Sequence, residues 1–419
     1  MSRLISKRID ELAFFNPSEK VVEGQILKKI PMENLNIWSR KITGFVLGEY
    51  KSGSKFRNND VLVAKITPCL ENGKTAYVDI LDENEVAFGS TEFIVLRPKE
   101  GIDSNFLYYL AISPTFRKRA ISCMEGTSGR KRVNESTLKL YDILLPQEKQ
   151  QKKIANVLLA LDKKIELNNR INAELEAMAK TLYDYWFVQF DFPNEEGKPY
   201  KSSGGKMVYN TTLKQEIPDG WIDKQLNSVV ERIGTGLNPR DNFKLGEGNN
   251  YYITIKDIEQ GRIIFSDKTD RISDVTLDII NKRSDIKVGD ILFTSIQPVG
   301  LTYLIHEKPV NWNINESVFT IRANQSLVTS EYLFKLLSSE QMKVFSKNSS
   351  SGSIHKGIRH GVLKTFVFAY ANLSLINKFT EMITPLLQKQ YKLEIENNNL
   401  QSLRDFLLPM LMNGQVTVK

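Results

Sequence analysis

Two long segments with apolar residues at every seventh position constrain the fold of this 419-residue chain more than any other feature. Adding 225 to each residue number carries the first segment onto the second. The paired positions are Ile154, Leu161, Asn168, Leu175 and Leu182, and then Phe379, Leu386, Leu393, Leu400 and Leu407. A second row lies three residues further along and comprises Val157, Ile171 and Met178, and then Met382, Leu403 and Met410. This spacing is typical of coiled-coil helices, and its recurrence indicates an internal duplication.

The first segment predicts a helix that begins after Pro146 and lasts to about Phe190. About 40 residues at ~1.5 Å each would make a rod of roughly 60 Å, which needs a partner for its apolar stripe. Asn168 interrupts that stripe. It is either a tolerated polar residue or a residue that fixes the register of the two helices, and the sequence leaves both interpretations open.

The second segment predicts a helix that begins near Asn372 and stops at Gly414, because glycine is a common residue just past a helix end. Pro385 lies inside this segment. Since proline lacks the amide proton that a helix interior needs, Pro385 should kink or split the helix, with Thr384 capping the longer part.

Outside the two helices, short β-branched segments alternate with loops and predict two mixed globules. The expected strands are residues 60–66, 93–96, 251–255, 290–296 and 317–321, and the expected short helices are 106–111 and 332–337. The polar segment 194–205 contains Gly and Ser and predicts a linker. The expected order is therefore globule, long helix, linker, globule, long helix.

The charge balance favours a polyanionic partner without proving one. Lys and Arg number 57 against 49 Asp and Glu, which gives a formal net charge of +8. Cys69 and Cys123 lie far apart without a CxxC spacing, so the sequence supports neither a disulfide framework nor a thiolate zinc site. We expect a soluble cytoplasmic protein without membrane contact, because neither a signal-peptide pattern nor a run of about 18 apolar residues is found.

The motifs of two enzyme classes are incomplete. A DNA amino-methyltransferase needs an Asn/Asp-Pro-Pro-aromatic loop, but Asn16-Pro17-Ser18 and Asn238-Pro239-Arg240 lack the second proline and the aromatic residue. The segment Gly48–Lys55 has the glycine spacing of a P-loop. It places Ser before Lys and no hydroxyl residue after it, so it does not predict ATP binding.

Three histidines, His306, His355 and His360, do not predict a metal site, since neither cysteines nor a tight carboxylate cluster accompany them. Catalytic triads converge only in space, so the sequence does not exclude one, although nothing local supports it. The pattern favours a non-catalytic binding protein that holds no metal or cofactor.

Two basic loops with interspersed glycine and hydroxyl residues precede the last strand of each globule. The candidate DNA-binding residues in these loops are Thr127, Ser128, Arg130, Lys131 and Arg132, and then Ser353, His355, Lys356 and Arg359. Hydroxyls and cations bind phosphate oxygens, and Arg or Lys can also reach guanine O6 and N7. A solvated turn would explain one such loop, but recurrence in both halves favours DNA contact.

Further candidates lie outside the basic loops, and each alone is better explained as an ordinary surface residue. They are Arg57, Lys65, Thr67 and Arg119 in the first globule and Arg240, Lys256, Ser295 and Gln297 in the second.

Several segments together resemble the DNA-specificity subunit of type I restriction-modification enzymes over essentially the whole chain. The run Leu403-Arg-Asp-Phe-Leu-Leu-Pro-Met-Leu-Met-Asn-Gly414 resembles the family's second conserved helix end. The other matching segments are 144–154, 182–187, 190–193 and Ile217-Pro-Asp-Gly-Trp221. The second copy has Ala369-Tyr370 where the first has Leu145-Pro146, which makes its helix start the less certain one. Recognition loops diverge widely in this family, so the resemblance indicates the architecture but not the DNA sequence.

The resemblance implies an α+β fold with two α/β target-recognition domains separated by two long antiparallel coiled-coil helices, in a pseudo-twofold internal repeat. The expected limits are 1–146 and 206–370 for the two recognition domains, 147–193 and 371–419 for the spacer helices, and 194–205 for the linker. Each domain would read one half of a bipartite asymmetric site in double-stranded DNA.

The resemblance also implies partners. The helices would set the spacer and dock two methyltransferase subunits, which carry S-adenosylmethionine, and a separate restriction or motor subunit would carry ATP. This chain would hold no cofactor and catalyse nothing. Two other classes remain open. An enzyme with a divergent site would bind S-adenosylmethionine saturably, and a coiled-coil scaffold would bind proteins without shifting DNA in a sequence-dependent way.

Overall fold

The chain folds into two compact units that share both long helices. The computed structural model describes residues 4–418 apart from 128, 241, 260 and 351–356. Unit 1 comprises Met1–Asn169 and Glu394–Lys419, and unit 2 comprises Arg170–Leu393. The division falls inside both helices, so the domain limits expected from the sequence stay a prediction.

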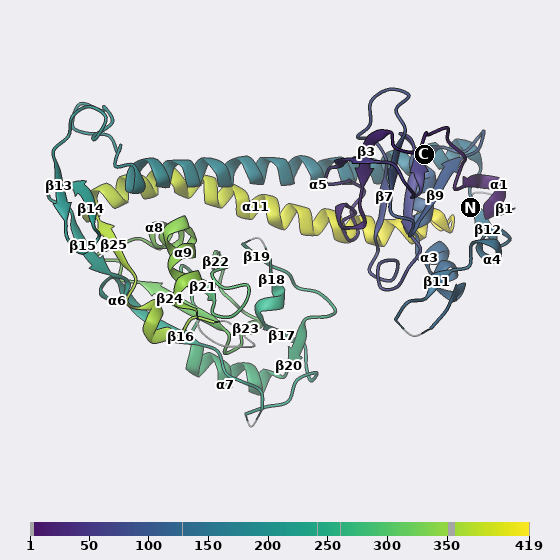
Figure 1. Ribbon diagram of the computed structural model, residues 1–419. Coiled ribbons are helices and arrows are strands. Elements are labelled where there is room, and N and C mark those ends of the chain that lie inside the picture. Colours follow the sequence, from purple (N-terminus) through teal and green to yellow (C-terminus); the bar gives the residue numbers. More distant parts are fainter. Residues whose placement is uncertain (1–3, 128, 241, 260, 351–356, 419) are drawn as a thin grey trace. The chain divides into compact units, whose positions relative to one another are not determined.

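The long helices α5 (Glu148–Tyr183) and α11 (Leu373–Met412) lie where the seven-residue period places them (Figure 1). A short π-helix, η2 (Asp184–Val188), continues α5. At the start of α11 the Asn372 side chain accepts a hydrogen bond of 2.9 Å from the Leu375 amide. At its end Gly414 has a φ of 66°, and the Gln415 amide donates to the Met410 carbonyl at 2.9 Å. The predicted start and stop of the second helix are confirmed.

Pro385 does not split α11, so the predicted split is wrong, while the alternative of a kink stays a prediction. The helix runs unbroken from Leu373 to Met412. Thr384 caps nothing, because its hydroxyl donates at 2.8 Å to the Thr380 carbonyl within the same helix. The apolar neighbours Ile383 and Leu387 are buried in the core of unit 2. Their burial offsets the roughly 3 kcal/mol that an interior proline costs a helix.

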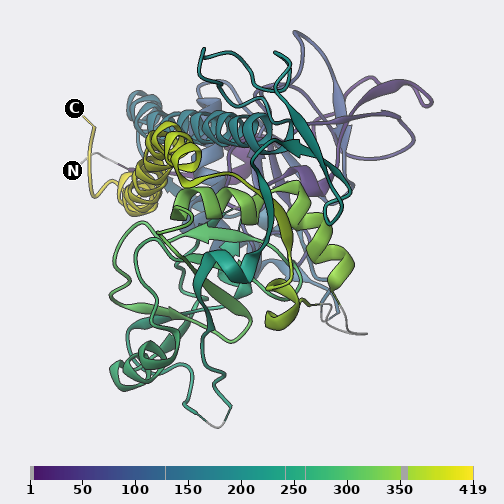
Figure 2. The ribbon, with the colours of Figure 1, turned by 90° about the vertical axis from the view of Figure 1, so that its left-hand side faces the viewer.

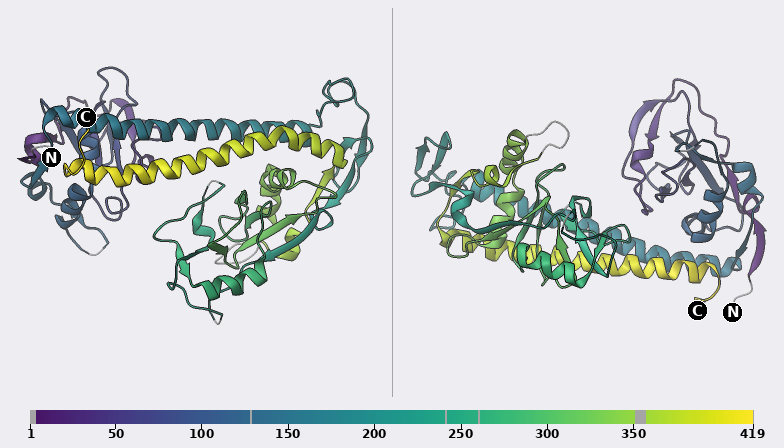
Figure 3. Two further views of the ribbon diagram at one scale, coloured as in Figure 1. Left: turned by 180° about the vertical axis from the view of Figure 1, so that it is seen from behind. Right: turned by 90° about the horizontal axis from the view of Figure 1, so that it is seen from below.

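Within each unit the two helices pack antiparallel, and Figures 2 and 3 show them side by side from other directions. The contacting pairs are Asp162–Arg404 and Asn169–Asn397 in unit 1, and Glu176–Gln390 and Tyr183–Phe379 in unit 2. The residue numbers rise along α5 as they fall along α11, which is the antiparallel order.

The first predicted apolar row lies between the helices or beside their contact. Ile154, Asn168, Phe379 and Leu393 are buried, and the remaining members are half-buried: Leu161, Leu175, Leu182, Leu386, Leu400 and Leu407. The Asn168 side-chain amide donates to Glu396 at 2.9 Å and to Asn397 at 3.0 Å. These bonds across the helix pair favour the register-fixing interpretation of Asn168 over that of a merely tolerated polar residue.

The second predicted row is wrong in part, because Met178, Met382 and Leu403 are exposed, whereas Val157, Ile171 and Met410 are half-buried like most of the first row. Met178 and Leu403 are 55% and 45% exposed. The row that faces the partner lies four residues after the first row instead of three, and its apolar members are Leu158, Ile165, Ala179, Trp186, Ile383 and Leu411. Its other members are the polar residues Asn172, Gln390, Asn397 and Arg404. Polar residues at these positions hide the row from a search for apolar periodicity.

Unit 1 contains two four-stranded sheets of order β2-β9-β6-β7 and β4-β3-β8-β5, and strand pairs β1-β12 and β10-β11. Its strands are β1 (Ile5–Arg8), β2 (Ala13–Phe15), β3 (Ile26–Ile30), β4 (Val46–Glu49), β5 (Lys55–Phe56), β6 (Val61–Ala64), β7 (Thr75–Tyr77), β8 (Ala87–Gly89), β9 (Phe93–Pro98), β10 (Met124–Glu125), β11 (Arg132–Val133) and β12 (Asp142–Leu145). Its short helices are α1 (Ile9–Leu12), η1 (Met32–Asn34), α2 (Ser104–Ile112), α3 (Pro114–Ser122) and α4 (Glu135–Lys139).

Unit 2 contains sheets of order β16-β24-β21-β22 and β20-β17-β23, and strand pairs β13-β14, β15-β25 and β18-β19. Its strands are β13 (Met207–Asn210), β14 (Gln215–Pro218), β15 (Ile222–Gln225), β16 (Val230–Thr235), β17 (Asn250–Ile253), β18 (Ile258–Glu259), β19 (Arg262–Ile263), β20 (Asp270–Ile272), β21 (Ile291–Thr294), β22 (Thr302–Leu304), β23 (Trp312–Ile314), β24 (Val318–Ala323) and β25 (Val367–Tyr370). Its short helices are α6 (Leu226–Val229), η3 (Ile255–Asp257), α7 (Asp274–Ser284), α8 (Ser330–Ser338), α9 (Glu340–Ser349) and α10 (His360–Leu363).

The two globules repeat one topology, which confirms the internal duplication. The order β2-β9-β6-β7 in unit 1 corresponds to β16-β24-β21-β22 in unit 2. In the second sheets, β3 pairs parallel with β8 and antiparallel with β4, as β17 does with β23 and β20. The predicted strands fall on β6, β9, β17, β21 and β24, and the predicted short helices fall on α2 and α8.

In each unit the core of the globule continues into the helix pair. Ile154, Leu158 and Leu411 belong to the same buried cluster as Val61 and Phe106 in unit 1. In unit 2 the buried aromatic residues of α5 and η2 pack against Phe379 and the globule. Because burial of apolar area is the main stabilising contribution, each globule is anchored on its own helix segments.

Candidate nucleic-acid interface

In unit 1 the loop after β6 lies against the basic loop that leads into β11. Ile66 and Arg132 form a β-bridge. The Thr67 amide donates to the Lys131 carbonyl at 3.0 Å, and the Lys131 amide donates to the Thr67 hydroxyl at 3.0 Å. The structure therefore brings together five residues that the sequence analysis proposed separately: Lys65, Thr67, Arg130, Lys131 and Arg132.

Some basic side chains of these two loops already form an ion pair with a carboxylate, and others do not. Arg132 donates to both oxygens of Glu92 at 2.6 to 3.0 Å, and Glu92 raises the pKa of Arg132. Lys65 lies 3.6 Å from a carboxylate oxygen of Glu135. Arg130 and Lys131 are exposed, and no carboxylate among the described residues pairs with either of them. They are the two cations of this loop that stay available to an anion.

Unit 2 builds the same arrangement with different side chains. Ile296 and Gly357 form the equivalent β-bridge. The Ile358 amide donates to the Ser295 carbonyl at 2.8 Å, as the Val133 amide donates to the Lys65 carbonyl at 2.9 Å. Gln297 and Arg359 are exposed beside this contact. The predicted residues Ser353, His355 and Lys356, like Ser128 in unit 1, lie outside the described residues.

Several predicted residues are held elsewhere or use their side chains internally. Arg57 precedes β6, at the opposite end of the strand from Lys65, and forms an ion pair of 2.6 Å with Glu19. The Arg119 guanidinium lies 4.7 Å from the ring centre of Tyr141, a cation–π contact within the fold. Ser295 is buried, and its hydroxyl donates to the Ser317 carbonyl at 2.8 Å. Among the described residues, no hydrogen bond or ion pair joins the side chain of Arg57 or Arg119 to the basic loop.

Three other predicted residues are exposed on unit 2, namely Arg240, Lys256 and Gln297. The Arg240 amide bonds the Asn238 side chain at 3.0 Å, and the Lys256 amide bonds the Thr254 hydroxyl at 3.3 Å. These bonds hold the backbone at Arg240 and Lys256, and no ion pair joins either side chain to another described residue. Thr127 is likewise exposed in the basic loop of unit 1.

An ion-pair cluster that the sequence analysis missed braces the β6 end of unit 1. Arg97 on β9 donates to the two oxygens of buried Asp60 at 2.8 and 2.7 Å. Its remaining amino group reaches Glu19 at 2.7 Å, and Glu19 also binds Arg57. Burial raises the pKa of Glu19, but the two guanidinium groups outweigh it, and the pKa of Glu19 lies below its ordinary value.

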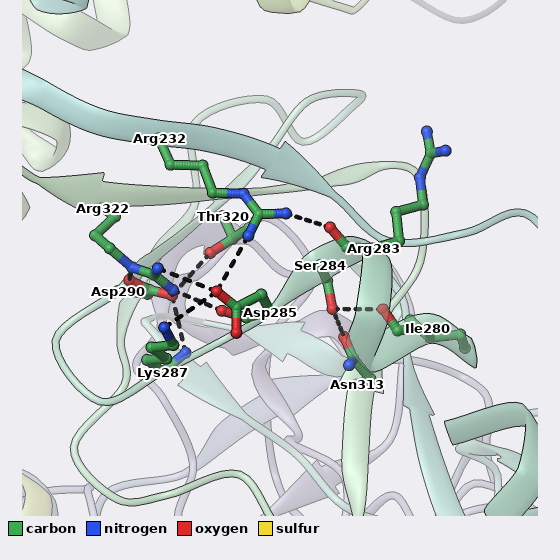
Figure 4. Close-up of polar contacts among 10 residues, drawn as sticks. All are labelled: Arg232, Ile280, Arg283, Ser284, Asp285, Lys287, Asp290, Asn313, Thr320 and Arg322. Atoms are coloured by element: carbon green, nitrogen blue, oxygen red, sulfur yellow. Dashed lines mark hydrogen bonds and ion pairs between the residues drawn. The ribbon is translucent and has the colours of Figure 1, made fainter. Parts of the chain in front are cut away.

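Unit 2 repeats this cluster, as Figure 4 shows. Arg322 donates to the two oxygens of Asp290 at 2.8 Å each. Arg232, Lys287 and Arg322 all lie 3.2 Å from one oxygen of Asp285. Burial raises the pKa of Asp285, but Lys287 and Arg322 outweigh it, so the pKa is lowered. The sequence contained a sign of this repeated ion pair, since Asp60 and Asp290 lie directly before the matching strands β6 and β21.

The two described histidines, His306 and His360, have other contacts, and His355 lies outside the described residues. His306 stacks on Tyr391 with ring centres 4.5 Å apart, and burial lowers its pKa. A ring nitrogen of His360 lies 3.0 Å from the Ile233 carbonyl. Within the part of the chain that the structure describes, no three His, Cys, Asp or Glu side chains gather in a way that could hold a metal ion. Among the same residues, no helix combines the length and apolar character that a membrane span requires.

The repeat of two globules, each followed by a long helix, coincides with the matches to a known family. Residues 24–177 and 218–373 each match the family described as type I restriction modification DNA specificity domain. The chain belongs to this family. It is a type I restriction-modification specificity subunit with two DNA-recognition domains.

Relatives that cover most or nearly all of the chain agree with this assignment. The HindI specificity subunit of Haemophilus influenzae is 26% identical over 471 aligned positions, which cover 99% of this chain and 98% of the relative. The MjaIX specificity subunit of Methanocaldococcus jannaschii is 27% identical over 335 positions, which cover 77% of this chain and 71% of the relative. The crystal structure of the S subunit from M. genitalium aligns over 98% of this chain and 96% of its own, with a TM-score of 0.56 and 16% identity. That structure supports the fold of this specificity subunit.

Proposed function

We propose that each recognition domain of this specificity subunit reads one half of a bipartite asymmetric DNA site. The observation that carries the proposal is the pair of equivalent loop contacts, Ile66 with Arg132 and Ile296 with Gly357. One scaffold thus presents two different sets of side chains, with exposed Arg130 and Lys131 in unit 1 and exposed Gln297 and Arg359 in unit 2. Because different side chains read different base edges, the same fold would read two unrelated half-sites.

The helix pair would set the spacer between the half-sites and dock two methyltransferase subunits. The exposed members of the second apolar row support docking, because Met178, Met382 and Leu403 are 55%, 50% and 45% exposed on the helices. In unit 2 an open groove of about 510 Å³ is lined by Met178, Leu182, Tyr185, Met382 and Leu386. Methionine adapts to irregular partner surfaces and is common where helices bind proteins.

The chain itself would be non-catalytic. S-adenosylmethionine would reside on the methyltransferase subunits and ATP on a restriction subunit, since the methyltransferase loop and the P-loop are both incomplete in this sequence. Titration of the isolated chain with S-adenosylmethionine tests this point. Saturable binding would mean that the chain holds its own methyl donor.

The methylome of cells with and without this gene tests the main proposal. We expect one bipartite methylated motif to disappear when the gene is deleted and to return with the gene on a plasmid. An unchanged methylome, combined with protein partners but no sequence-dependent shift of DNA, would instead favour a scaffold.

A further inference from the structure

Two carboxylates on α5 each join a recognition-domain helix to α11. They are Asp162 in unit 1 and Glu176 in unit 2. We call these contacts the Asp162 junction, with Tyr109 and Arg404, and the Glu176 junction, with Lys335 and Gln390. Each is formed entirely within one unit.

The Asp162 junction connects three elements through one side chain. The Tyr109 hydroxyl on α2 donates to one oxygen of Asp162 at 2.7 Å, and Arg404 on α11 donates to the other oxygen at 3.0 Å. Tyr109 is fully buried, and the Asp162 and Arg404 side chains are nearly so. Burial and the neighbouring carboxylate both raise the pKa of Tyr109, so its hydroxyl keeps its proton and remains a donor.

The Glu176 junction has the same connections with different donors. Lys335 on α8 donates to Glu176 at 3.0 Å, and its side chain is only 3% exposed. Gln390 on α11 donates to the other oxygen of Glu176 at 3.3 Å. Lys335 occupies the position on α8 that Tyr109 occupies on α2, since both are the sixth residue of their helices. Equivalent helix positions therefore reach a carboxylate of α5 in both units.

The spacing of the two junctions follows the heptad period of the helices. Glu176 lies 14 residues after Asp162 on α5, and Gln390 lies 14 residues before Arg404 on α11. The pair Asn169–Asn397, with a hydrogen bond of 2.9 Å, lies one heptad from each. Since seven residues make two turns of a coiled-coil helix, all three polar pairs fall on one stripe.

We infer that Asp162 and Glu176 are positioning residues that fix the orientation of each recognition domain on the helix pair. Apolar packing between a globule and a helix is non-directional, so it resists rotation of the globule weakly. The energy of a hydrogen bond depends steeply on its angle. A bond from α2 or α8 to an α5 carboxylate that α11 also binds therefore resists rotation of the globule. The junctions thereby determine how strictly the subunit discriminates between spacer lengths. This inference rests on the proposed reading of a bipartite site.

Tyr109→Phe tests the inference, because it removes one hydroxyl and keeps the ring that fills the core. The variant is assembled with the methyltransferase subunits, and its affinity is measured for DNA with the two half-sites at the preferred spacer and at spacers one base pair shorter and longer. We expect the half-site sequences to stay unchanged and the discrimination between spacers to fall by about tenfold, which corresponds to about 1.4 kcal/mol. Lys335→Met should act similarly from the Glu176 junction.

Tyr332→Phe is the matched control, since the buried Tyr332 hydroxyl has no hydrogen-bond partner in the described structure. It should leave the discrimination unchanged. An equal loss of affinity at every spacer in Tyr109→Phe and Lys335→Met would show a merely structural role and would overturn the inference. Unchanged discrimination between spacers in both variants would also overturn it. If the wild-type complex bound DNA without any sequence preference, the proposed function itself would fail. A wild-type complex that reads both half-sites and a Tyr109→Phe complex with intact discrimination would refute only the positioning role.

Discussion

Arg97 holds Asp60 through two parallel hydrogen bonds of 2.8 and 2.7 Å, although 37 residues separate them in the sequence. The same pair recurs in unit 2 as Arg322 and Asp290, with both bonds at 2.8 Å. In each unit the aspartate also accepts a backbone amide three residues earlier, at 2.8 Å from Arg57 and 2.9 Å from Lys287. The duplicated domain thus keeps one ion pair that closes the turn before its central strand.

Breaking this pair should destabilise unit 1 strongly. Asp60→Asn removes the charge of one of the two buried carboxylates that bind Arg97 and leaves only Glu19, so we expect the free energy of unfolding to fall by about 3 kcal/mol. Urea unfolding of the full chain measures the change. Asp82→Asn is the control, because Asp82 also pairs with a lysine, at 2.8 Å from Lys28, but its side chain is 85% exposed. A comparable loss in both variants would show that the burial of Asp60 contributes nothing.

The pH dependence of stability should carry a contribution from Glu19. Its pKa in the folded chain is lowered from an ordinary value of 4.5. A carboxyl with a lowered folded pKa stabilises the fold at pH values above its unfolded pKa, and that stability is lost as the pH falls through the folded pKa. Thermal unfolding between about pH 6 and pH 3 should therefore show a steeper loss for the wild type than for Glu19→Gln. Parallel curves would exclude this role.

Much of the architecture could be predicted because it depends on apolar periodicity. The apolar row that contains Ile154 and Phe379 predicted the two long helices, the need of each helix for a partner, and the internal duplication. The facing row could not be found, because its α11 members are polar: Gln390, Asn397 and Arg404 donate hydrogen bonds to the Asn172 carbonyl, Asn169 and Asp162 on α5 instead of burying apolar area. The basic loop was predicted from composition. Its contact with the loop after β6 depends on pairing between segments about 65 residues apart, such as Ile66 with Arg132, which local patterns do not encode.

Replacing the free cations of the basic loop should flatten the salt dependence of DNA binding. Each phosphate contact adds roughly 0.9 to the slope of log affinity against log salt, so Arg130→Ala with Lys131→Ala should lower the slope by up to about 1.8. This slope is measured from the affinity of the assembled complex for DNA at several salt concentrations. Arg132→Ala should change the slope less, because Glu92 already binds Arg132. An unchanged slope in the double variant would place this loop outside the interface. Arg359→Ala tests the loop of unit 2 in the same way.

Exchange of one recognition domain should change one half-site only. Residues 206–370 begin after the polar segment 194–205 and end with β25, which pairs with β15 inside the exchanged segment. The exchange therefore leaves no strand pair divided between two parents. We expect the methylome to keep the half-site read by unit 1 and to gain the other half-site of the donor. A change in both half-sites, or in the first alone, would contradict the assignment of one domain to one half-site.

Lengthening the helix pair by one heptad tests whether it measures the site. Seven residues inserted after Asn169 in α5 and seven before Glu394 in α11 keep both rows between the helices in phase, whereas four residues would shift the rows and could abolish packing for a trivial reason. The insertion adds roughly 10 Å of helix, which equals about three base pairs at ~3.4 Å per pair.

Those extra base pairs also rotate the second half-site by about 100°. The DNA or the helices must therefore twist, and affinity should fall even for the best new site. Binding to a series of spacers should therefore show a longer preferred spacer with both half-sites unchanged, or weak binding throughout. Full affinity for the original spacer would mean that the helices do not measure the distance between half-sites.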